Sequence, residues 1–148
     1  MAGDSAAAER KLGEARDLAE ATAGRPQDKR PWSYRLTPAV LANEEGITCA
    51  YLAGSGPSWH ERAASLLTVT PDEAALRAAA KNLTWLTFAH AQADDVGQAC
   101  ATALQASTAV RRTGSVPHAA TLSQVSAELT ARYPADQRVA KLADALAA

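Results

Sequence analysis

The 148-residue chain has few aromatic side chains and little strand-like patterning. Aromatic residues make up 5% of the sequence and there are 8 glycines, a composition that suits closely packed helices better than a β-sandwich. The nearest approach to a β-branched run, residues 66–70, ends in a helix-start signal. About a quarter of the residues are alanine, the strongest helix former. The sequence therefore predicts an all-α protein that forms one domain over residues 1–148.

The chain also lacks an excess of charge, a cysteine cluster and a long apolar run. Its net charge is -1, with 15 basic and 16 acidic residues, which disfavours a nucleic-acid-binding surface. Cys49 and Cys100 belong to no CxxC or Cys/His cluster, so we expect buried, reduced thiols. No stretch of 18 apolar residues occurs, and residues 1–5 lack the basic start of a signal peptide. We therefore expect a soluble, cytoplasmic protein without a membrane partner.

Helix-start signals divide the chain into about seven predicted helices. Thr37 and Pro38 combine an N-cap with proline at the first helical position. Capping boxes occupy residues 58–61 and 70–73, and Asp95 with Gln98 forms a weaker one. Further N-cap candidates are Ser115 and Asp136, and Gly54 and Gly114 are candidates for left-handed helix ends. The predicted helices cover residues 4–22, 38–53, 59–68, 72–93, 95–112, 116–132 and 136–147, with a polar loop over residues 23–37.

Small or apolar residues recur at positions i, i+4 and i+7 at three places along the chain. The three sets are Ala8/Leu12/Ala15, Ala63/Leu67/Thr70 and Ala99/Ala103/Ala106. Residues at this spacing share one helical face, and alanines there let a second helix approach closely. A helix, a tight turn and a second helix with small residues on its packing face together form the pattern of a tetratricopeptide repeat. We expect antiparallel hairpins stacked as a short right-handed solenoid, with repeats over residues 38–132 and a capping helix over 136–147.

Several segments carry a resemblance to a known family. Residues 30–38, 43–46, 59–64, 82–106 and 111–115 resemble the C-terminal tetratricopeptide-repeat region of actinobacterial helix-turn-helix regulators of the xenobiotic-response-element class. The resemblance extends over residues 6–147 and rests on packing residues. It implies a module that receives a signal from a peptide or partner protein. Because 148 residues leave no room for the family's DNA-binding domain, specific DNA binding is not expected.

No residue set in the sequence predicts catalysis, a cofactor or a metal site. His60, His90 and His118 lie in separate predicted helices, and the sequence around His60 lacks the second histidine of HExxH. Adjacent carboxylates at Glu44/Glu45 point about 100° apart on a helix, so they cannot face one substrate together. The second pair, at residues 94–95, is placed to complement a helix N-terminus. Structural roles are the better interpretation of all these groups.

A partner-binding surface is predicted on the inner face of the repeats. Arg77, Lys81, Thr84 and Phe88 follow one another at i, i+4, i+7 and i+11, and Asn43 lies on the preceding inner helix. Such a stripe suits an extended or helical acidic peptide; the alternative is a solvated helix face. Trp32 and Tyr34, in the loop before the second helix, are further candidates because aromatic residues are frequent interface hot spots.

Three functions remain open from the sequence. The first is a non-enzymatic protein- or peptide-interaction module. The second is a small-molecule-binding or auxiliary biosynthetic protein, which a closed pocket lined by Trp85 and His90 would favour. The third is an enzyme on a helical scaffold.

The first predicted helix lacks a preceding repeat partner. Its Ala8/Leu12/Ala15 face therefore belongs to a remnant of a longer ancestor, or it is covered by another molecule or by the chain's own helices. We expect a homodimer through this face.

Overall fold

The chain folds into α-helices throughout the residues that the structure describes. This computed structural model describes residues 2–22, 37–69 and 75–147. These residues form seven α-helices, one 3-10 helix and no strand: α1 (Ala2–Thr22), α2 (Pro38–Leu52), η2 (Ala53–Ser55), α3 (Pro57–Leu66), α4 (Leu76–Gln92), α5 (Val96–Thr113), α6 (Val116–Arg132) and α7 (Gln137–Ala147). The all-α prediction is confirmed.

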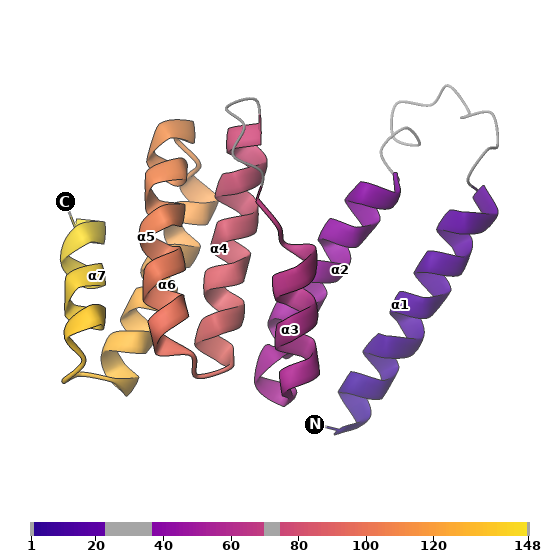
Figure 1. Ribbon diagram of the computed structural model, residues 1–148, viewed down its shortest axis with the longest axis horizontal. Helices are drawn as coiled ribbons and strands as arrows, with labels where there is room; N and C mark the ends of the chain where they lie inside the picture. The colour runs from indigo at the N-terminus through magenta and orange to yellow at the C-terminus, as the bar shows by residue number, and fades with distance from the viewer. Residues whose placement is uncertain (1, 23–36, 70–74, 148) are drawn as a thin grey trace.

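Successive helices pack as hairpins that stand side by side in one row, from α1 at one end to α7 at the other (Figure 1). The most extensive interface joins α4 to α5, and α2 packs against α3 in the same way. Between hairpins, α4 contacts both α2 and α6, while α5 contacts α7. The helices α2, α4 and α6 are therefore neighbours along one side, as expected for the first helices of stacked hairpins.

Small buried residues allow these helices to approach closely. Ala99 and Ala106 are fully buried, and Ala103 is 1% exposed, in a core cluster built from α4 to α7. Ala63 and Leu67 are fully buried in a second cluster formed by α2, α3 and α4. Two of the three predicted packing faces thus lie in the core; Thr70, the last residue of one, is outside the described residues.

Four of the predicted helix caps are confirmed by hydrogen bonds or backbone conformation. One is Asp136 before α7, whose carboxylate accepts a hydrogen bond from the Arg138 backbone N–H at 2.8 Å. The Thr37 hydroxyl accepts a hydrogen bond from the Val40 backbone N–H at 3.3 Å, and the Asp95 carboxylate accepts one from Gln98 at 3.1 Å. Gly114 ends α5 with φ 64°, the left-handed conformation that glycine adopts without steric cost.

Two other predicted signals are wrong. The helix α3 begins at Pro57, with Gly56 as its N-cap, so Ser58 lies inside the helix. Proline at the first helical position explains the earlier start, because its fixed φ suits the helix and its missing N–H costs nothing there. Gly54 lies within η2 and does not take a positive φ. The capping box predicted at residues 70–73 lies outside the described residues.

The helix α1 lies beside α2, and charged side chains link it to α2 and α3. Glu45, with a side chain 9% exposed, accepts hydrogen bonds from Arg16 at 2.8 and 2.9 Å and from Arg62 at 2.7 Å. Arg62 also donates to Glu9 of α1 at 2.8 Å. The predicted face containing Ala8 is half-buried. The chain's own helices therefore cover part of the α1 face.

Candidate functional site

Three aromatic rings gather on the side formed by α2 and α4. Tyr51 of α2 lies 5.1 Å from the Trp85 ring and 5.2 Å from the Phe88 ring, and the two α4 rings are 5.8 Å apart. The rings meet in tilted or edge-to-face arrangements, the geometry that aromatic pairs favour. Tyr51 nevertheless remains 60% exposed. This aromatic cluster, Tyr51/Trp85/Phe88, is the largest concentration of ring surface among the described residues.

Charged residues continue the same side of α4 toward its N-terminus. Lys81 donates to Glu44 of α2 at 2.7 Å. The pairs Glu44/Lys81 and Tyr51/Phe88 have the same sequence separation of 37 residues, so α2 and α4 run parallel with a constant register. Arg77, one turn before Lys81, is exposed. An exposed cation, an ion pair and the aromatic cluster thus follow one another along this side.

Two of the predicted inner-face residues are engaged inside the protein. Thr84 is fully buried, and its hydroxyl donates to the Ala80 carbonyl at 2.7 Å. Asn43 donates to the buried Asn82 side chain at 2.6 Å. The stripe that we predicted is therefore interrupted at Thr84, because that position faces the neighbouring helices. Of the five predicted inner-face residues, Arg77, Lys81 and Phe88 remain on the accessible side.

The predicted loop aromatics Trp32 and Tyr34 lie outside the described residues. Tyr51, which is not among the residues predicted from the sequence, is the exposed aromatic candidate for partner binding among the described residues. The signal that could have found it is its position seven residues after Glu44, on the same face of the same helix.

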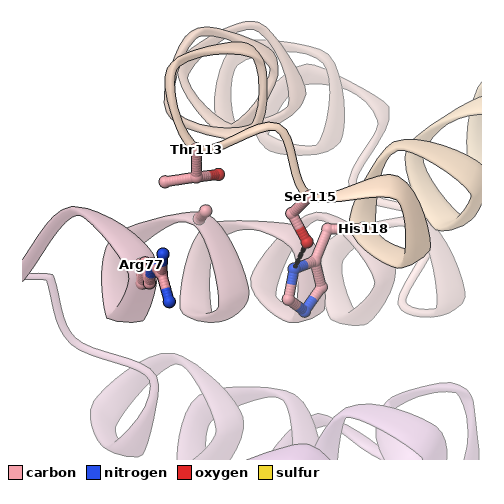
Figure 2. A pocket seen from close by; sticks show the side chains of 5 residues that line it. Arg77, Thr113, Ser115 and His118 are labelled. Atoms are coloured by element: carbon pink, nitrogen blue, oxygen red, sulfur yellow. Dashed lines mark hydrogen bonds between the residues drawn. The ribbon is translucent and has the colours of Figure 1, made fainter.

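A pocket of about 330 Å³ opens between the start of α4 and the turn from α5 to α6, as Figure 2 shows. It is lined by Arg77, Ala80, Thr113, Ser115 and His118. The Ser115 hydroxyl and the His118 Nδ1 atom are 2.7 Å apart. The Thr113 hydroxyl donates to backbone carbonyls of its own helix. Burial, followed by the charge of Lys81, lowers the pKa of His118.

A second histidine contact was not predicted from the sequence. The His60 Nε2 atom lies 2.7 Å from the His90 Nδ1 atom, and His90 is 7% exposed. Burial, followed by the charge of His60, lowers the pKa of His90, while Asp95 opposes this effect. The two residues lie 30 positions apart in the sequence, so only the packing of α3 on α4 brings them together.

The carboxylate pairs have structural partners, as the sequence analysis favoured. Glu44 and Glu45 form separate ion pairs with residues of different helices. Asp95 caps α5, whereas Asp94 accepts a hydrogen bond from the Tyr133 hydroxyl at 2.8 Å and pairs with Arg132. The first acidic pair therefore links helices, and the second fixes the turn between α4 and α5.

The described residues offer no evident metal or nucleophile site. Among them, no group of three or more histidine, cysteine, aspartate or glutamate residues could hold a metal ion. Cys49 and Cys100 are free and buried. Burial, with a smaller contribution from Glu45, raises the pKa of Cys49 to about 11, so this thiol is poorly activated as a nucleophile. None of the described helices combines the length and apolar character needed to cross a membrane.

The Ser115–His118 contact resembles part of a nucleophile–base pair, but it lacks the third group that would orient the imidazole. Within the described residues, no carboxylate hydrogen-bonds to the Nε2 atom of His118. No protein-family model matches this chain, and no curated protein or solved structure is significantly similar to it.

Proposed function

We propose that the chain is a non-enzymatic peptide- or protein-binding module that uses the side formed by α2 and α4. The observation that carries this proposal is the aromatic cluster, in which Tyr51 stays 60% exposed against Trp85 and Phe88. Aromatic residues are enriched among interface hot spots because they bury a large rigid area at a small entropic cost. A single exposed ring needs no explanation, but an exposed ring supported by two half-buried rings, Trp85 and Phe88, favours an anchor site.

The charges beside the cluster suggest the kind of peptide. Arg77 makes no ion pair with a described residue, and the Lys81 ammonium lies between the cluster and Arg77 along α4. An apolar or aromatic anchor residue would contact Tyr51, with acidic residues placed toward Arg77. We interpret the stacked hairpins as a tetratricopeptide-like right-handed solenoid, in which this side corresponds to the inner face. The resemblance to the sensor region of bacterial regulators supports the same function.

A second candidate is binding of a small molecule, which the pocket of about 330 Å³ favours. Neither Trp85 nor His90, the residues that we expected to line such a pocket, takes part in it. Its polar lining suits a charged ligand better than an apolar one.

Selection of peptides from a random phage-displayed library on the immobilised chain tests the principal proposal. We expect enriched peptides with an apolar anchor and neighbouring acidic residues. The dissociation constant of a synthetic copy should rise roughly tenfold or more in Tyr51→Ala, the loss typical of a hot-spot residue.

Leu104→Ala is the matched control, because Leu104 is also an exposed apolar side chain, at 41%, but lies on α5. Peptide affinity should be unchanged in this variant. The proposal would be contradicted if the affinity of the selected peptides fell equally in Tyr51→Ala and Leu104→Ala. It would also be contradicted if the affinity fell in neither variant.

A further inference from the structure

The pocket between α4 and the α5–α6 turn combines donor groups from three segments that are far apart in the sequence. Arg77 enters it from α4, Ser115 from the turn and His118 from the first turn of α6 (Figure 2). The described residues of the lining include no acidic side chain. Glu44 of α2 is paired with Lys81 of α4. The pocket is therefore electrostatically suited to an anion.

The hydrogen-bonding capacity of the lining also favours an anion. Arg77 is exposed, and none of the hydrogen bonds within the described residues uses its five guanidinium N–H donors. When the Ser115 hydroxyl donates to Nδ1 of His118, the neutral imidazole carries its proton on Nε2. No described residue bonds this second nitrogen. With His118 in this tautomer, Arg77 and the His118 Nε2–H are the two donor groups that the described lining offers to a ligand.

The usual structural role of Ser115 does not account for this arrangement. Ser115 is the N-cap residue of α6, yet its side chain makes no capping hydrogen bond. A serine at this position normally accepts a bond from a backbone N–H two or three residues later. Here the hydroxyl is instead turned to His118 at 2.7 Å. The pair therefore fixes the imidazole at the pocket wall at the expense of the helix cap.

We propose that this pocket binds the phosphate group of a small phosphomonoester, with Arg77 donating from one side and the Ser115–His118 pair holding the other. Guanidinium groups bind phosphate oxygens through two parallel hydrogen bonds, which are stronger than bonds between neutral groups. The volume of about 330 Å³ is roughly ten times the share of one water molecule in the liquid. It therefore leaves room for an organic group beside the phosphate. The inference rests on the second candidate function, binding of a small molecule, and specifies the chemical class of that molecule. It does not depend on the peptide proposal.

NMR titration of the full chain with inorganic phosphate and with glycerol phosphate tests this inference, with sodium chloride at equal ionic strength as the reference. The Hε1–Cε1 signal of His118 should shift and saturate with both phosphate compounds, and glycerol phosphate should bind at least as tightly. Sodium chloride should produce no saturable shift. The signal of His60 serves as an internal reference, because His60 does not line the pocket.

Arg77→Gln should weaken phosphate binding roughly tenfold or more, as expected for loss of a charged hydrogen-bond donor. Arg10→Gln is the matched control, since Arg10 is exposed on α1 and should leave binding unchanged. Arg77→Lys keeps the charge but removes the paired donors, so it should bind with intermediate affinity.

A His118 shift that does not saturate, that sodium chloride reproduces, or that survives Arg77→Gln unchanged would overturn the inference. The peptide proposal would still stand in that case, because its test depends on Tyr51.

Discussion

Polar residues inside the helices satisfy their hydrogen bonds locally. Thr84 donates to the carbonyl four residues earlier, and Thr87 does the same to Leu83 at 2.8 Å. Both threonines are fully buried. Within the described residues, no buried side-chain nitrogen or oxygen lacks a partner. A hydroxyl that bonds its own helix adds little desolvation cost, which is why threonine is tolerated at the centre of α4.

The His60–His90 contact makes stability depend on pH. The pKa of His90 is lowered in the folded chain by burial and by His60, while the unfolded chain has the ordinary value of about 6.5. As the pH falls below 6.5, His90 is therefore protonated more readily in the unfolded chain than in the folded chain. We expect the free energy of unfolding to be highest above pH 6.5 and to fall as the pH decreases below it.

Urea unfolding at pH 7.5 and at pH 5.5 measures this effect. His90→Gln should reduce the loss of stability between the two pH values. His118→Gln is the control. The pKa of His118 is also lowered, but the loss of stability caused by protonation of His90 should remain in this variant. An unchanged pH dependence in His90→Gln would show that the buried imidazole is not responsible.

At the scale of the helices, close approach depends on individual small residues. A Cβ atom added to Gly46 of α2 would lie 3.0 Å from the Leu66 Cβ atom and from Leu67 side-chain atoms. No atom of the described residues outside its own helix backbone lies within 4 Å of a Cβ atom added to Gly13 of α1. The two glycines thus differ in packing although both lie inside helices.

Alanine substitutions at these two positions should change stability in opposite directions. Gly13→Ala should stabilise the chain by about 0.5–1 kcal/mol, because alanine has the higher helix propensity. Gly46→Ala should destabilise it by about 1–2 kcal/mol, because overpacking against α3 exceeds the same propensity gain. Thermal unfolding of both variants checks the prediction, and stabilisation by Gly46→Ala would contradict the α2–α3 packing.

The attachment of α1 depends on a charge network centred on Glu45. Glu45→Gln should destabilise the chain by about 1–3 kcal/mol, because Arg16 and Arg62 lose a shared and largely buried carboxylate. Glu14→Gln is the control: its pair with Lys11 is exposed, with side chains 54% and 70% accessible, and its loss should cost no more than about 0.5 kcal/mol. Denaturant unfolding measures both. Equal losses of unfolding free energy in the two variants would mean that the burial of Glu45 does not strengthen its ion pairs.

At the scale of the whole molecule, α1 is the least embedded helix. None of its described side chains is buried, and Leu18 is 65% exposed. Part of the face containing Leu12 is covered by the chain's own helices, and the homodimer that we expect would use what remains. Exposed apolar surface of this kind favours self-association.

Light scattering at tens of micromolar tests the expected homodimer. The parent chain should have twice the mass of one copy, and Leu12→Glu should lower the mass toward that of a monomer. Leu104→Glu, on the distant α5, should leave the mass unchanged. A monomeric parent would refute the homodimer, and unchanged stability in Leu12→Glu would also exclude a packing role for this face.

The helices and most of their ends could be predicted from the sequence, because they depend on neighbouring residues. Thr37 with Pro38, Asp95 with Gln98, and Gly114 act within one turn of the backbone. The small packing face of α5 was predictable for the same reason, since helical periodicity alone places Ala99 and Ala106 together. Two local signals failed: α3 begins at Pro57, so the expected N-cap Ser58 lies inside the helix, and Gly54 lies within η2 without the left-handed conformation.

The candidate sites depended on tertiary structure, because they require the register between helices. Periodicity placed Thr84 on the same stripe as Phe88, but packing against neighbouring helices buried it completely. The contact of Tyr51 with Phe88 requires that α2 and α4 run parallel at one particular offset. Likewise, the phosphate-site candidate exists only because the α5–α6 turn returns His118 to the start of α4, where Arg77 lies. Local propensity selects the helices, whereas the way their side chains interlock decides which residues reach the surface together.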